Sequence, residues 1–172
     1  MRYKVNDISE GGIDVHVEVS EAWLAAECPD SPLSLSQAGV SLDGRLEPAG
    51  EGYLLRGTLR GEVTVPCARC LEPAPVTLDS PLAISFIERG GKDDAEAEAQ
   101  DDVVLYEHGV VDLGVPIRDE LLLALPMNPI CRPECAGICP TCGSNRNLTP
   151  CECEKQAPGA AKFATLAKMK LQ

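Results

Sequence analysis

The sequence has few aromatic residues, and this limits what its core can be made of. Phe, Trp and Tyr make up only 3% of the 172 residues, whereas apolar residues as a whole reach 44%. A core must therefore be built from Val, Leu, Ile and Ala. Disordered chains combine high charge with low hydrophobicity, so this composition predicts a folded chain, long enough for one domain and a small appendage.

An excess of positive charge is also missing, since the formal net charge is −12 at pH 7. Lys and Arg neutralise phosphates and release counterions, and this supplies most of the non-specific affinity for nucleic acids. A chain this acidic is expected to bind bare RNA or DNA weakly. It is not expected to adhere to an anionic membrane surface either.

Long apolar runs are absent as well. No stretch approaches the roughly 18 to 20 apolar residues of a membrane span. The first residues, Met1 to Asp7, turn polar at once and lack the apolar segment of a secretory signal. We therefore expect a cytoplasmic protein with no membrane partner. Thiols are kept reduced in the cytosol, so nine cysteines favour metal or redox chemistry over a disulfide framework.

Alternating apolar and polar residues predict a β-rich body. Ile13 to Val19 alternates strictly, which predicts a half-buried strand, and residues 20–27 predict a short helix with Ser20 as its N-cap. A β-rich stretch follows from about Val40 to Glu88. Its longest alternating run is Tyr53 to Val65, where Gly57 and Gly61 predict a bend or a bulge.

Shorter elements complete this body. Further strands are expected at residues 76–78, 82–87 and 103–106, and a helix from Pro116 to Leu125 with Pro at its first position and acids in its first turn. Trp23 is expected to anchor the core from the first helix. These elements predict an α+β fold: an antiparallel meander or partial barrel with a few short helices and a C-terminal cysteine-rich appendage.

Charge is unevenly distributed along the chain. Residues 90–102 hold six acids and no large apolar residue, which predicts a solvated loop or, alternatively, an acidic mimic of nucleic acid. The last residues carry four lysines, Lys155, Lys162, Lys168 and Lys170, and residues 162–171 could form a short amphipathic helix. We expect a body over residues 1–126, including the acidic loop 90–102, and a cysteine-rich zinc tail over residues 127–172.

The strongest motif is a cluster of six cysteines near the C-terminus. It comprises Cys131, Cys135, Cys139, Cys142, Cys151 and Cys153. The Cys139-x2-Cys142-Gly143 part can form a tight knuckle that points two thiolates at one ion, and Zn²⁺ takes four such ligands in a tetrahedron. The pair Cys151 and Cys153 follows after an eight-residue excursion, long enough to fold back. Zinc is the preferred interpretation, with a redox thiol set or an iron–sulfur cluster as alternatives.

A second Cys-x2-Cys pair, Cys67 and Cys70, stands far away in the sequence. A lone pair cannot complete a zinc site, so these two cysteines could close a second site with Cys131 and Cys135. The alternative is a strand-end turn whose thiols are merely buried. Cys28 is expected to be a small buried apolar residue.

Residues for catalysis are not evident. His16 and His108 are expected to be ordinary surface histidines, and the sequence shows no Ser-His-Asp pattern, phosphate-binding glycine loop or spaced carboxylate pair. The sequence therefore predicts a protein that is not an enzyme.

Three stretches resemble the YceD family of large ribosomal RNA subunit accumulation proteins. They are Val65 to Pro73 around the first cysteine pair, the helix leading to Leu125-Pro126, and the run from Cys131 to Gly143, with Cys151 and Cys153 completing the order. Arg146 stands where the family pattern has Leu before Asn147, and residues 157–159 depart from the Asp-Pro-Arg expected there. The resemblance implies a role in accumulation or processing of large-subunit ribosomal RNA and implies no catalytic residues.

These observations favour a ribosome-biogenesis factor that works as a binding module or adaptor. Its acidic body suits basic ribosomal or rRNA-processing proteins as partners, with weak RNA contact through the lysines of the tail. The rival hypothesis is a thiol redox or metal-handling protein that uses the Cys67 and Cys70 pair.

Overall fold

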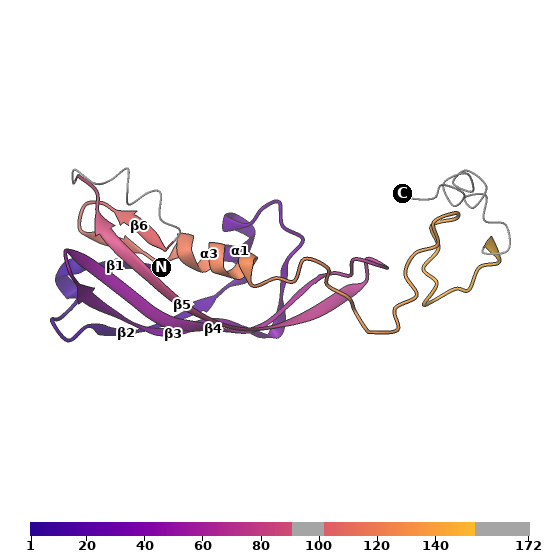
Figure 1. Ribbon diagram of the computed structural model, residues 1–172, viewed down its shortest axis with the longest axis horizontal. Helices are drawn as coiled ribbons and strands as arrows, with labels where there is room; N and C mark the ends of the chain where they lie inside the picture. Colours follow the sequence, from indigo (N-terminus) through magenta and orange to yellow (C-terminus); the bar gives the residue numbers. More distant parts are fainter. Residues whose placement is uncertain (91–101, 154–172) are drawn as a thin grey trace, which may run out of the picture.

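The computed structural model describes residues 1–90 and 102–153, and it is mostly β-sheet with two α-helices (Figure 1). The elements are β1 (Arg2–Lys4), a 3-10 helix η1 (Val5–Asp7), β2 (Ile13–Val19), α1 (Glu21–Glu27), β3 (Ser34–Ala49), β4 (Gly52–Pro66), β5 (Pro73–Glu88), β6 (Val103–Tyr106), β7 (Val110–Asp112) and α3 (Gly114–Leu123). The expected α+β class is consistent with this content.

The main sheet is open and has the strand order β2-β3-β4-β5-β6. Its first four strands form the antiparallel meander that the alternating sequence predicts. Strand β6 differs, because it pairs with β5 in parallel, so the sheet is mixed and not purely antiparallel. A separate two-stranded sheet joins β1 to β7.

One strand is longer than expected. Residues 76–78 and 82–87 belong to the single strand β5, which runs through Pro81. Proline cannot donate a hydrogen bond to a neighbouring strand, so it is confined to strand edges and bulges. Strand β6 pairs with β5 only from Ser85 to Glu88, so Pro81 lies where β5 is still an edge strand. Pro81 therefore does not break the pairing with β4, where it lies opposite Thr58.

Glycines allow the long strands to approach and bend, as the sequence predicts. Gly57 lies opposite Gly44 in the β3–β4 pair, and a Cβ on Gly57 would stand 2.7 Å from the Asp43 carbonyl oxygen. Gly61 has φ 147° and lies opposite Val40, where the register shifts between Leu35 and Val40. The irregularity thus falls at the predicted glycine, with the extra residues on β3.

The two helices lie against the same face of the main sheet (Figure 1). Helix α1 begins as expected, because the Ser20 Oγ accepts a hydrogen bond from the Trp23 N–H at 3.2 Å. Helix α3 begins at Gly114, two residues before the expected Pro116, so no acid lies in its first turn. Its start is set by Asp112, whose Oδ1 accepts a hydrogen bond from the Gly114 N–H at 2.9 Å.

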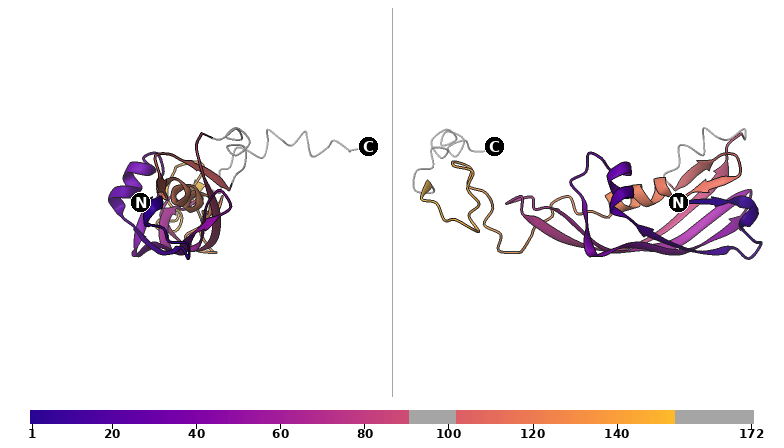
Figure 2. Two further views of the ribbon diagram at one scale, coloured as in Figure 1. Left: turned by 90° about the vertical axis from the view of Figure 1, so that its left-hand side faces the viewer. Right: turned by 180° about the vertical axis from the view of Figure 1, so that it is seen from behind.

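The core lies between this face of the sheet and the helices. Leu42 and Leu59 face each other across β3 and β4 and are fully buried, as are Ile117 and Leu121 on α3. Seen along the long axis, the curved sheet surrounds α3 (left view of Figure 2). Trp23 is half-buried and packs against this core, in keeping with the expected anchor.

The last described residues, 139–153, lie at one end of an elongated molecule, beyond the turn between β4 and β5 (Figure 1). Within the described ranges, no helix combines the length and the apolarity needed to cross a membrane. The acidic segment of residues 91–101, the terminal helix expected at residues 162–171 and the four tail lysines lie outside the described residues.

Candidate metal centres

The turn between β4 and β5 holds the first cysteine pair. The two strands stay paired up to Pro66 and Pro73, and the chain between them folds into a compact knuckle. The Leu71 N–H donates to the Cys67 carbonyl oxygen at 3.0 Å, and the Cys67 N–H donates to the Glu72 carbonyl oxygen at 2.8 Å. Both Cys67 and Cys70 are buried.

The chain after α3 crosses this turn and brings a second pair of cysteines to it. The Ala68 N–H donates to the Pro129 carbonyl oxygen at 2.7 Å, and the Ile138 N–H donates to the Arg69 carbonyl oxygen at 2.8 Å. The Arg69 guanidinium also donates to the Cys135 carbonyl oxygen at 3.2 Å. Backbone contacts on both sides of residues 131–135 therefore hold that segment over the turn.

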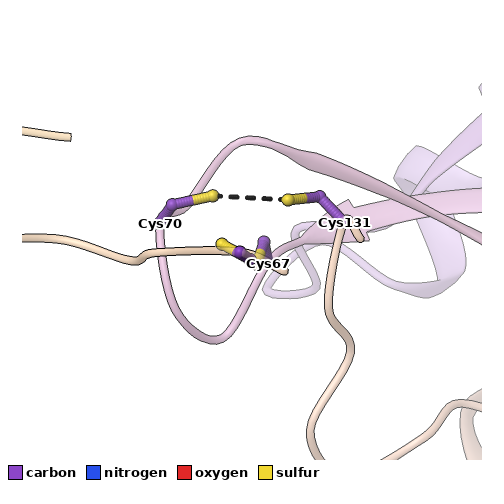
Figure 3. Close-up of side chains that lie close together, drawn as sticks. Cys67, Cys70 and Cys131 are labelled. Atoms are coloured by element: carbon purple, nitrogen blue, oxygen red, sulfur yellow. Dashed lines mark hydrogen bonds between the residues drawn. The ribbon is translucent and has the colours of Figure 1, made fainter. Parts of the chain in front are cut away.

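Four sulfur atoms meet as a result. The Sγ atoms of Cys67, Cys70, Cys131 and Cys135 all lie within 4.8 Å of one another; we call these residues the hairpin cluster. The Cys70 and Cys131 sulfur atoms face each other at 3.6 Å (Figure 3). The Cys67 and Cys135 sulfur atoms lie 3.9 Å apart.

These distances fit a metal ion. A tetrahedron with Zn–S distances near 2.3 Å has edges of about 3.8 Å, close to the sulfur–sulfur distances of 3.6 and 3.9 Å in this cluster. A disulfide would require a separation near 2 Å, and all nine cysteines are free thiols. The donor set, four thiolates in reach of one point, suits Zn²⁺ and leaves no position open for a substrate.

Hydrogen bonds prepare two of these thiols for ionisation. Burial raises the pKa of Cys67, but backbone N–H groups, led by that of Arg69, outweigh it and lower the pKa to about 6. Burial also opposes ionisation of Cys135, but its pKa is lowered, first by the Asn147 side chain. Burial raises the pKa of Cys70 to about 12 and raises that of Cys131. Neighbouring thiolates repel one another, so a divalent cation is what would let all four ionise.

A second group of four cysteines lies further along the tail. The Sγ atoms of Cys139, Cys142, Cys151 and Cys153 also lie within 4.8 Å of one another; we call these residues the tail cluster. Its first pair forms the predicted knuckle, because the Gly143 N–H donates to the Cys139 carbonyl oxygen at 2.9 Å and Gly143 has φ 73°.

In the tail cluster, too, the surroundings lower the pKa of two thiols and raise that of another. Hydrogen bonds from Ser144 lower the pKa of Cys142 to about 6. The pKa of Cys139 is lowered, first by the Cys142 backbone N–H. The neighbouring Cys142 raises the pKa of Cys153 to about 12. Cys142 is exposed, whereas three cysteines of the hairpin cluster are buried and Cys131 is partly buried.

Two asparagines connect the clusters, and sequence reasoning gave them no role. The Asn147 side chain donates to the Cys135 Sγ at 3.4 Å and accepts from the Ala136 N–H at 2.9 Å. Asn145 donates to the Glu72 carboxylate at 3.2 Å, next to the hairpin cluster. The sequence signals were their short spacing after the knuckle and the place of Asn147 in the family pattern. Neither signal identified their partners, which lie in other segments.

The structure thus brings together all eight cysteines that the sequence singled out, in the grouping considered for them. Their metal binding stays a prediction. Cys28 joins neither group and is buried, as expected. His16 and His108 are exposed, as expected, with His16 paired to Asp43 on the sheet surface.

Comparisons with known proteins agree with these motifs. Residues 55–170 match the family model described as "Large ribosomal RNA subunit accumulation protein YceD". A Mycobacterium tuberculosis protein named "Uncharacterized protein Rv2926c" is 38% identical over 104 residues, which cover 60% of this chain and 50% of that protein.

Two relatives carry the family's name. "Large ribosomal RNA subunit accumulation protein YCED homolog 1, chloroplastic" of Zea mays is 27% identical over 153 residues, covering 73% of this chain and 50% of that protein. "Large ribosomal RNA subunit accumulation protein YceD" of Haemophilus influenzae is 31% identical over 96 residues, covering 56% of this chain and 55% of that protein. The chain spans about half the length of the curated relatives it matches. No solved structure matches it.

Proposed function

The chain belongs to the YceD family, and from this premise we propose that it supports the accumulation or processing of large-subunit ribosomal RNA as a non-enzymatic factor. The observation that carries the proposal is the family match over residues 55–170, which includes all eight clustered cysteines. The relatives from Zea mays and Haemophilus influenzae are named for this role. We assign the protein to the cytoplasm.

Within this function, the two cysteine clusters serve as structural zinc sites. A zinc ion with four thiolate ligands has a closed coordination shell and stabilises the fold around it. The hairpin cluster takes two ligands from the β4–β5 turn and two from the tail, so a zinc ion there would join segments separated by more than 60 residues. The tail cluster organises residues 139–153, which have few large buried side chains to fold on.

The burial of the hairpin cluster supports this role over a redox one. The Cys67 side chain has no exposed surface and Cys70 is 4% exposed. A thiol that exchanges disulfides with a partner must be reached by that partner's sulfur. The Cys67 and Cys70 pair lacks this access, so thiol redox chemistry is the weaker candidate function.

The charge of the chain supports a protein partner. With a net charge of −12, the chain repels phosphate and attracts basic surfaces over about a Debye length, near 8 Å at physiological salt. The partners we propose are basic ribosomal proteins or rRNA-processing proteins. RNA contact through the tail lysines would be weak and would fall steeply with salt.

The function is tested by deleting the gene in its native host and measuring the ratio of large-subunit to small-subunit ribosomal RNA. We expect the ratio to fall and to be restored by the wild-type gene. A variant with Cys67 and Cys70 both replaced by Ser should restore it poorly, whereas Cys28→Ser should restore it fully. An unchanged ratio in the deletion strain would refute the proposal.

A further inference from the structure

Helix α3 carries apolar side chains on more than one face. Ile117 and Leu121 are fully buried against the sheet, as expected for the inner face of an amphipathic helix. Val115, Leu122 and Leu123 are nevertheless 43%, 39% and 80% exposed. Most of the exposed large apolar residues among those described lie between residues 115 and 130. Apolar residues gathered in this way on a surface are typical of an interaction site.

A groove of about 300 Å³ runs beside this helix. Its apolar lining comes from β5, β6 and α3 and includes Leu82, Ile84, Val104, Pro116 and Leu123. Among the described residues, the three charged ones that line it, Asp102, Asp119 and Glu120, are acidic. Arg118 pairs with Asp119 at 2.8 Å and balances one of these charges, so the groove keeps an apolar floor and a negative rim.

A second hollow adjoins the start of the same helix. It measures about 470 Å³ and shares Val104 with the groove, while Val115 of α3 also lines it. Its lining holds both signs of charge, with Arg2 paired to Asp112 at 2.7 Å. Glu107, also in the lining, pairs at 2.8 Å with Arg89, which lies outside it. The second hollow thus adds apolar surface only at the start of α3, next to Val115.

We propose that this α3 groove binds an amphipathic segment of a protein partner that carries lysine or arginine beside its apolar residues. The apolar floor would accept the partner's aliphatic side chains, and the acidic rim would select for positive charge. The inference rests on the proposed function, because basic ribosomal or rRNA-processing proteins are the partners that it predicts, and it names the surface that meets them.

Other occupants fit the surface less well. Two copies of this chain would each bring a net charge of −12, and like charges at a contact oppose association. RNA would place phosphates against Asp102 and Glu120 and would leave the apolar floor without a partner. A basic apolar segment satisfies both the floor and the rim.

The binding test uses the full-length protein and a synthetic helical peptide of leucine and lysine, labelled for fluorescence anisotropy. One matched peptide replaces each lysine by glutamate, and another replaces each leucine by serine. We expect the leucine–lysine peptide to bind and both matched peptides to bind more weakly. Equal binding of the leucine–glutamate peptide would overturn the proposal, because the acidic rim would then select nothing.

Single variants locate the binding surface. Leu123→Ser is expected to weaken the leucine–lysine peptide about tenfold, the loss that follows from removing one buried leucine contact. Leu148→Ser, an equally simple change at a 73% exposed residue of the tail, should leave binding unchanged. Asp102→Lys keeps the apolar floor and should weaken binding severalfold, with a smaller salt dependence. Unchanged binding in both Leu123→Ser and Asp102→Lys would place the peptide elsewhere and overturn the proposal.

Two further results would assign the groove to another occupant and also overturn the proposal. The first is a wild-type dimer in sedimentation that Leu123→Ser abolishes, which would make a second copy the occupant. The second is tighter peptide binding by Phe163→Ser, which would make the chain's own residues 154–172 the occupant.

The same variants separate this inference from the proposed function. In the deletion strain, wild type and Leu148→Ser should restore large-subunit ribosomal RNA, and Leu123→Ser should not. Full restoration by Leu123→Ser would refute the groove while leaving the function intact. A deletion that does not lower large-subunit ribosomal RNA would refute the function itself, whatever the peptide does.

Discussion

Leu71 and Gly143 occupy the same position in two cysteine knuckles. Each follows the second cysteine of a Cys-x2-Cys pair, each N–H donates to the carbonyl oxygen of the first cysteine, at 3.0 and 2.9 Å, and each has a left-handed backbone, with φ 64° and 73°. Glycine adopts this conformation readily, whereas leucine is strained in it by roughly 1 kcal/mol. Leu71 is also 67% exposed, so its side chain offsets little of that strain by burial.

Replacing Leu71 by glycine should therefore stabilise the protein. We expect Leu71→Gly to raise the free energy of unfolding by up to about 1 kcal/mol, because relief of the strained φ exceeds the entropy that glycine loses on folding. Gly143→Ala is the matched control and should destabilise by about 1 kcal/mol, since an added Cβ would meet no atom within 4 Å and only the backbone is strained. Urea unfolding of the zinc-loaded protein measures both; destabilisation by Leu71→Gly would contradict the account.

Asn147 should control how firmly the hairpin cluster holds zinc. Its side chain donates to the Cys135 Sγ and accepts from the Ala136 N–H, and such hydrogen bonds to metal ligands are typically worth about 10- to 100-fold in metal affinity. We expect Asn147→Ala to speed zinc loss from this cluster to a competing chelator by at least about tenfold. Leu148→Ala is the control, because it changes the exposed neighbour and removes no contact to sulfur. Equal rates in the two variants would leave Asn147 without this role.

The two clusters should organise different parts of the tail. Loss of one zinc ligand unfolds the segment that the metal holds, so Cys142→Ser should expose residues 139–153 to protease. Cys131→Ser should instead detach residues 129–138 from the β4–β5 turn and leave the tail cluster intact. In both variants the sheet should stay resistant, since its core lies in β2 to β5 and α3. A tail that resists digestion in Cys142→Ser as well as in wild type would contradict a metal-organised tail.

The pair formed by His16 and Asp43 should make a pH-dependent contribution to stability. The His16 Nδ1 lies 2.6 Å from the Asp43 Oδ1, and this hydrogen bond raises the pKa of His16 above its ordinary value of 6.5. Because the folded state holds the proton more tightly, the stabilisation is fully present below pH 6.5 and is lost as the pH rises through the raised pKa. An NMR titration should show a lower His16 pKa in Asp43→Asn than in wild type. Identical pKa values would show that Asp43 does not raise the pKa of His16 and would contradict this prediction.

Local patterns in the sequence predicted much of the fold. Alternation located β2 and the long strand β4, and the Ser20 cap located α1, because each depends on neighbouring residues. The continuity of β5 through Pro81 could not be predicted, since it depends on where β6 begins to pair. The parallel pairing of β6 with β5 could not be predicted either, because it is also a long-range contact.

The candidate metal centres could be predicted only in part, because one of the two depends on contacts between distant segments. The spacing of Cys139 and Cys142 predicts a knuckle by itself, and the left-handed Gly143 closes it. The hairpin cluster joins residues 61 and 68 positions apart, so spacing could only suggest that Cys67 and Cys70 meet Cys131 and Cys135. The role of Asn147 depends on a contact across that same junction.

The central claim, that the eight clustered cysteines form two structural zinc sites, is tested most directly by counting metal. Elemental analysis of the purified full-length protein, with free thiols counted in parallel, should give two zinc ions per chain. Cys131→Ser and Cys142→Ser should each retain one, and the double variant none. Wild-type protein that contains no zinc, or whose clustered cysteines are joined in disulfides, would contradict the account.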